Sequence, residues 1–159
     1  MKKMLIPLAA GALFAGSAAL ADEDMIALAM SAGPEAIASE ATIMLPDGTV
    51  LRKGSDYWTC FPYIGENVDS GPVCADPIWT AAMRSELVDG HYAVDETGVS
   101  YMLAGNLPHI MVIIPGAGSL EGFNSDFGDG KTWVMSQPAP HLMIPIEMDS
   151  EEEAPEADE

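Results

Sequence analysis

Two short stretches near the C-terminal end of the chain, residues 107–115 and 140–146, carry the same pattern of Pro, His, a branched apolar residue and Met. Both stretches indicate β-strands, because they are short apolar runs rich in branched residues and bounded by proline. Residues two apart in a strand point to the same face, so His109 shares a face with Met111, and His141 with Met143. If the two strands are neighbours, the pattern predicts one metal site with two imidazoles and two thioethers, a set suited to a soft metal such as copper as Cu(I).

The same pattern also fits two strands that pack in the same way against one core. Methionine fills irregular gaps in apolar cores, and a buried histidine is usually hydrogen-bonded to a neighbour. A metal site requires adjacent strands, a suitable register and four side chains that reach one point. Packing requires only that both strands place these side chains against the core. The sequence leaves both interpretations open.

The N-terminal stretch has the features of a secretory signal peptide. Lys2 and Lys3 precede an apolar run over residues 4–15, and Ala19 and Ala21 form a small-x-small cleavage site. The apolar run is too short to span a membrane as a helix, and no later stretch is long and apolar enough. We therefore expect a signal peptide over residues 1–21, a single exported globular domain over 22–148, and a periplasmic or secreted protein.

The chain is strongly acidic, with 25 acidic and 6 basic residues and a formal net charge of −19. Cleavage after Ala21 would leave 4 basic and 25 acidic residues, a formal charge of −21. So few cations exclude a nucleic-acid partner, and the protein partner stays open. The last residues, 149–159, are almost all acidic or small, which predicts a disordered acidic tail.

Cys60 and Cys74 are the only cysteines of the chain. In an exported protein an isolated pair predicts a disulfide, and closing a loop of this size would stabilise the fold by about 3 kcal/mol. A redox pair or a pair of copper thiolates is the functional alternative, although the spacing is far from Cys-x-x-Cys.

The remaining signals predict an α+β fold. Pro46, Asp47 and Gly48 mark a turn between strands at 42–45 and 49–52, and further strands are expected at 99–104 and 132–135. A short helix is expected at 34–40, and the main helix at 77–88 starts after the capping residue Asp76. We expect a small antiparallel sheet of about five strands, with this one main helix packed on a face and one disulfide.

The chain resembles two groups of exported bacterial proteins. The first is a set of small proteins without assigned function, and the resemblance rests on Trp58-Thr59-Cys60, Cys74 with Asp76 and Trp79, Tyr101-Met102-Leu103, and the two His-x-Met strands. It implies a shared fold only. The second resemblance is local: residues 140–143 are similar to the terminal His-x-Met of periplasmic copper chaperones of the PCuAC type. Those chaperones have a Met directly after an upstream His, where this chain has Ile110.

These observations favour an exported, non-catalytic protein that binds copper through its twin His-x-Met strands. The alternative is a cell-envelope interaction or structural module without metal, which would use the aromatic residues Tyr57, Trp58, Phe61 and Tyr63. A hydrolase of unknown type has less support, because the chain contains no Gly-x-Ser-x-Gly and no His-Glu-x-x-His motif.

Overall fold

The computed structural model describes residues 16–89, 95–115, 131–135 and 140–147. Most of the predicted signal peptide and the predicted acidic tail at 149–159 lie outside these residues. Helix α1 (Gly16–Met30) runs across the predicted cleavage site after Ala21. Within the described ranges, no helix is long and apolar enough to cross a membrane.

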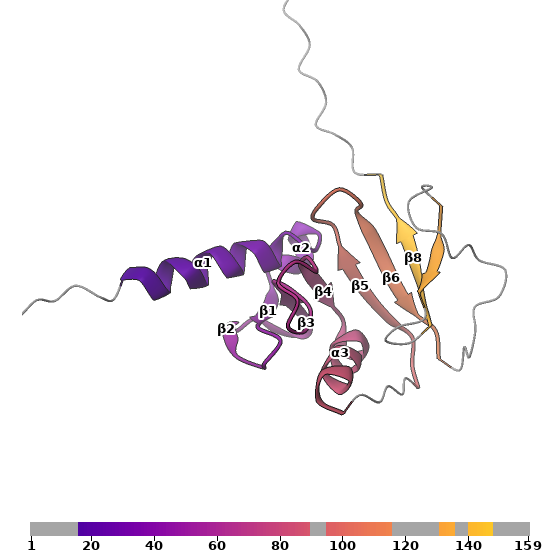
Figure 1. Cartoon of the computed structure of the whole chain (residues 1–159), viewed down its shortest axis with the longest axis horizontal. Helices are drawn as coiled ribbons and strands as arrows, with labels where there is room; N and C mark the ends of the chain where they lie inside the picture. Colours follow the sequence, from indigo (N-terminus) through magenta and orange to yellow (C-terminus); the bar gives the residue numbers. More distant parts are fainter. Residues whose placement is uncertain (1–15, 90–94, 116–130, 136–139, 148–159) are drawn as a thin grey trace, which may run out of the picture.

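Eight strands form one mixed sheet in the order β2-β1-β3-β4-β5-β6-β8-β7 (Figure 1). All neighbouring strands are antiparallel except β1 and β3, which are parallel. The strands are β1 (Ala41–Met44), β2 (Val50–Arg52), β3 (Ser55–Phe61), β4 (Val73–Ala75), β5 (Gly98–Met102), β6 (His109–Ile113), β7 (Trp133–Met135) and β8 (His141–Pro145).

The predicted antiparallel sheet of about five strands with one main helix is therefore wrong. Over the described residues the sheet has eight strands and is mixed, and the helices beside it are few and short. The difference lies in β3 and β4, because no strand was expected at residues 55–61 or 73–75. They pair with each other and join the hairpin of β1 and β2 to the rest of the sheet, which makes a single continuous surface.

The local signals predicted several elements well. Strands β1 and β2 form the expected antiparallel hairpin, with Gly48 at φ +92° in its turn. The turn is closed by hydrogen bonds from the Leu45 N–H to the Thr49 carbonyl and from the Gly48 N–H to the Leu45 carbonyl. The short helix predicted at 34–40 is present as α2 (Glu35–Ala38), and the helix predicted at 77–88 is present as α3 (Pro77–Asp89). The longer helix α1 was not expected.

The two faces of the sheet are covered by different helices. On one face, Trp79, Ala82 and Met83 of α3 pack into the main core with side chains from β3 to β8. On the other face, Ala29 and Ala32 at the end of α1 and just beyond it pack with α2 against β1, β3 and β4. In β4, Val73 and Ala75 belong to the main core, and Cys74 belongs to the core on the other face. This division is expected because successive side chains of a strand point to opposite faces.

The predicted disulfide between Cys60 and Cys74 is confirmed. The two cysteines are direct cross-strand partners on β3 and β4, their Cα atoms are 4.0 Å apart, and both side chains are fully buried. The bond closes the loop between β3 and β4 at its base, so it holds the two ends of residues 62–72 together.

Helix α3 is attached to the sheet through Asp76. The Asp76 carboxylate accepts hydrogen bonds from the Trp79 N–H at 2.8 Å and from the Val99 N–H at 2.7 Å. The first bond caps the helix and the second ties it to β5. Gly98 on β5 allows a close approach, since a Cβ atom there would lie 2.9 Å from Cγ2 of Ile78.

Candidate metal site

The two His-x-Met strands are direct neighbours in the sheet. In the antiparallel register of β6 and β8, Met111 lies opposite Met143, while His109 lies opposite Pro145 and His141 opposite Ile113. All four His and Met side chains are buried on the face that carries α3. The structure therefore brings the two thioether residues together in the middle of the strand pair.

The register separates the two histidines. His109 and His141 lie four register positions apart, which corresponds to about 13 Å along the strand direction. Two imidazole nitrogens bound to the same metal lie only roughly 4 Å apart. Side chains on a sheet stand nearly perpendicular to it, so the two imidazoles flank the methionine pair on opposite sides rather than meeting at one point.

The environment of His109 leaves one ring nitrogen unpaired. Its Nδ1 donates a hydrogen bond to the Leu107 carbonyl at 2.7 Å, which fixes the proton on Nδ1, since a carbonyl can only accept. Its Nε2 is buried and has no hydrogen-bond partner among the described residues, and the whole side chain is only 8% exposed. Burial lowers the pKa of His109, with a smaller opposing effect from the Leu107 hydrogen bond, so the ring is neutral at pH 7.

His141 has a different environment. Its ring packs edge-on against Trp79 of α3, with ring centroids 5.2 Å apart. Trp79 is a buried member of the main core. The structure thus places His141 against the helix, whereas His109 packs near Trp133 of β7, with ring centroids 5.7 Å apart.

Met102 is a third thioether beside His109, outside the set predicted from the sequence. It lies directly opposite His109 on β5, is half-buried and packs against the main core. Strand parity already placed Met102 on the face opposite to Tyr101. Its pairing with His109 depends on the length of the turn between β5 and β6, which no sequence pattern determines.

Next to His109 and Met102, a continuous row of buried residues crosses the four strands β5, β6, β8 and β7. Ser100, Met111, Met143 and Trp133 are cross-strand partners in succession, and each is at most 5% exposed. The hydroxyl of Ser100 is buried without a hydrogen-bond partner among the described residues. Most buried polar atoms in proteins are hydrogen-bonded to the protein or to water, so a polar group could also reach this hydroxyl.

The aromatic residues near the start of the loop divide between core and surface. Trp58 is half-buried and packs against Tyr101, with ring centroids 5.5 Å apart, beside the end of α1. Tyr57 is 59% exposed. Trp58 therefore covers the core around the disulfide, and Tyr57 lies at the surface.

Comparisons with protein-family models, with curated proteins and with solved structures found no match for this chain. In the described part of the chain, no group of three or more His, Cys, Asp and Glu side chains is placed to hold a metal. Methionine sulfurs are not among those ligand types.

Proposed function

We propose that this protein is an exported, non-catalytic Cu(I)-binding protein whose site is centred on His109. The ligands are Nε2 of His109 and the thioethers of Met111 and Met143, with Met102 as a further sulfur at the edge. The observation that carries the proposal is the buried Nε2 lone pair without a hydrogen-bond partner among the described residues, on the same face as these sulfurs.

Strand geometry supports the convergence of these side chains. Met111 is two residues from His109 on the same strand, which is about 7 Å between Cα atoms, and Met143 is its diagonal neighbour at about 7–8 Å. Methionine has three rotatable bonds, so its sulfur can move toward a common point while the backbone stays in place. This set of ligands leaves out His141, so it does not require the two distant histidines to reach one metal.

The ligand types favour Cu(I) over harder cations. Thioethers are soft ligands, while Mg²⁺ and Ca²⁺ prefer oxygen. The imidazole binds metal only when neutral, and the lowered pKa of His109 keeps it neutral at pH 7. Its Nδ1–H bond to the Leu107 carbonyl orients the ring, which is the usual arrangement around a metal-bound histidine.

Trp133 would add to the attraction for a bound cation without selecting among metals. It is buried, lies opposite Met143 on β7 and packs near His109. The face of an indole ring attracts a nearby cation. The neutral His–Met set leaves the single charge of Cu(I) uncompensated, so this attraction contributes to binding.

Export agrees with the disulfide and with the N-terminal sequence. Disulfides form and persist in oxidising compartments, and the buried Cys60–Cys74 bond fits a periplasmic or secreted protein. The basic, apolar and small-x-small segments at 1–21 supply a route of export.

The test is a Cu(I) competition titration of the mature chain, residues 22–159, against a chromophoric chelator without oxygen. Replacing Met111 and Met143 by Leu keeps volume and apolarity, so the fold should survive while Cu(I) binding is lost. Met83→Leu is the matched control, because Met83 is buried in the same core but belongs to α3 and lies beside Pro46 and Phe61. The Met83→Leu variant should bind Cu(I) with the same affinity as the parent chain.

The two histidines provide a second, sharper comparison. His109→Gln should abolish tight Cu(I) binding, and His141→Gln should retain it. Equal Cu(I) affinity in the parent chain, the double Leu variant and His109→Gln would refute the proposal. Loss of binding in His141→Gln alone would refute the choice of ligands.

A further inference from the structure

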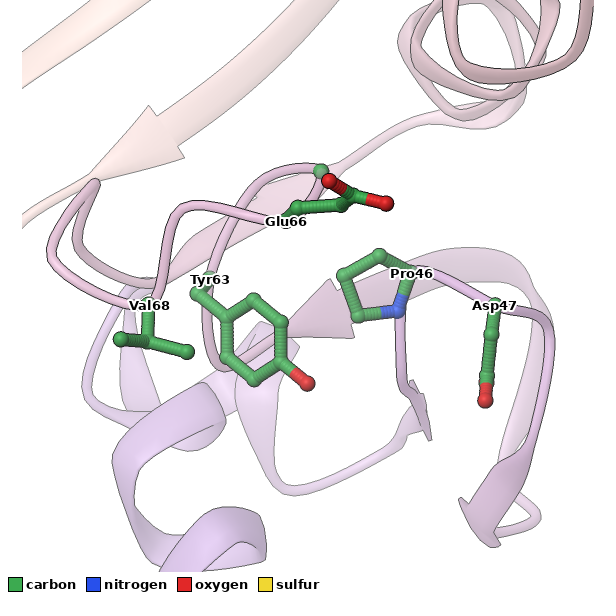
Figure 2. A pocket seen from close by; sticks show the side chains of 6 residues that line it. Pro46, Asp47, Tyr63, Glu66 and Val68 are labelled. Carbon is green, nitrogen blue, oxygen red and sulfur yellow. The ribbon is translucent and has the colours of Figure 1, made fainter.

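A hollow of about 350 Å³ lies between the turn that joins β1 to β2 and the loop that joins β3 to β4 (Figure 2). Pro46 and Asp47 come from the turn, and Tyr63, Gly65, Glu66 and Val68 come from the loop. The volume falls at the lower end of the range for small-ligand sites, about 300–1,000 Å³. None of these residues belongs to the candidate metal site.

Hydrogen bonds hold both walls of the hollow in place. On the turn, Asp47 accepts a hydrogen bond from the Thr49 N–H at 2.8 Å. On the loop, the Ile64 N–H donates to the Ser70 hydroxyl at 2.6 Å, and the disulfide joins the strands at the loop's two ends. A site whose walls are already ordered loses less conformational entropy when a ligand binds.

The walls combine apolar surface with negative charge. The rings of Tyr63 and Pro46 and the side chain of Val68, which is 64% exposed, supply the apolar part. Asp47 and Glu66 supply two carboxylates, and the hydrogen bonds from Thr49 lower the pKa of Asp47, so it stays ionised at neutral pH. Figure 2 shows Tyr63, Glu66 and Val68 on the loop and Pro46 and Asp47 on the turn, with the Tyr63 ring between Val68 and Pro46 in this view.

Arg84 is a basic residue close to this hollow, although it does not line it. Arg84 lines a smaller cavity that shares Pro46, Tyr63 and Gly65 with the hollow. Its Nη1 is 3.5 Å from the sulfur of Met44, and its Nη2 would lie 3.8 Å from a Cβ atom placed on Gly48. The residues that line the hollow offer an aromatic ring, an apolar wall and carboxylates. That combination repels anions and attracts a cation carried on an aliphatic stem.

We propose that this hollow binds an ammonium or guanidinium group on an aliphatic stem. The charged group would lie between the Tyr63 ring and the Glu66 carboxylate, and the stem would lie along Pro46 and Val68. A lysine or arginine side chain of a basic peptide and a free polyamine-like cation share this chemistry. The hollow and the metal site lie on different residues, so either proposal can fail alone.

The experiment is an NMR titration of the mature chain with two probes, agmatine and an acetylated, amidated tri-arginine peptide. Both probes should shift the backbone amide signals of Tyr63, Glu66 and Val68 more than those of other residues. Glu66→Gln should weaken binding about two- to fivefold, and Tyr63→Leu by a similar factor. Glu66 is exposed, so its variant folds even if the Tyr63 variant does not.

Asp69→Asn is the matched control, because Asp69 is exposed on the same loop and does not line the hollow. It removes the same charge as Glu66→Gln, so general attraction to an acidic protein would weaken both variants equally and would overturn the proposal. Absence of localised shifts with both probes would also overturn it. Tighter binding of the peptide, lost in Glu66→Gln, supports a protein segment as the occupant, and equal binding of both probes supports a free organic cation.

Discussion

Replacing His109 by Gln should remove a defined part of the pH dependence of folding stability. The native pKa of His109 is lowered from 6.5, chiefly because burial disfavours the charged ring. In the unfolded chain the ring titrates near its ordinary pKa of about 6.5. Below this pH the unfolded state therefore binds a proton that the native state does not, and the stability contributed by a neutral His109 is lost as the pH falls toward its native pKa.

The magnitude follows from proton linkage. One group that is protonated in the unfolded state and neutral in the native state changes the free energy of unfolding by at most about 1.4 kcal/mol per pH unit. The free energy of unfolding of the parent chain should thus fall more steeply than that of His109→Gln below pH 6.5, by up to this slope. The amide of Gln can still donate to the Leu107 carbonyl, so the variant should fold.

The assay is urea unfolding at half-unit steps between pH 5 and pH 8, followed by tryptophan fluorescence. Both chains carry the same 25 acidic residues, so the difference between the two profiles isolates position 109. The two profiles should run parallel above pH 7 and separate below pH 6.5. Parallel profiles over the whole range, or a difference of the opposite sign, would refute the neutral, buried imidazole and with it the premise of the metal site.

Three further changes test the scaffold. Replacing Cys60 and Cys74 by Ala should lower the free energy of unfolding by about 3 kcal/mol, and a loss below about 1 kcal/mol in urea titrations would contradict a stabilising cross-link. Asp76→Ala should cost about 2–4 kcal/mol because two N–H groups lose their acceptor, and Asp76→Asn, which keeps one acceptor, should recover part of that loss. Gly98→Ala should lower the free energy of unfolding by about 1–3 kcal/mol because the new Cβ would meet Ile78. In a chain that already carries Ile78→Ala, thermal unfolding should show a smaller loss of stability from Gly98→Ala. Equal penalties with and without Ile78 would show that the contact is not the cause.

Short-range signals predicted the parts of the fold that depend on neighbouring residues. The turn at Pro46, Asp47 and Gly48 needs only local backbone preferences, and the start of α3 needs only Asp76 and Pro77. Strand β3 was not predicted because it begins with the polar residues Ser55 and Asp56 and lacks a clear alternation of apolar and polar residues. Its parallel pairing with β1 is a long-range contact that no local pattern encodes.

In the candidate site, too, local patterns predicted less than long-range pairing determines. Alternation along a strand predicted which side chains share a face, and the structure places His109, Met111, His141 and Met143 on one face. Alternation does not predict register, which decides that Met111 meets Met143 and that His109 and His141 do not meet. The place of Met102 beside His109 follows from register in the same way.

The edges of the sheet have a consequence for the behaviour of the protein at high concentration. Among the described strands, β2 and β7 lie at the edges of the sheet. Each is three residues long, so each offers few backbone groups to a strand from another molecule. Lys53 follows β2 and Lys131 precedes β7, and lysine beside an edge strand opposes strand addition. Two of the chain's few basic residues thus stand where they hinder edge-to-edge aggregation, and replacing both by Thr should promote fibril formation.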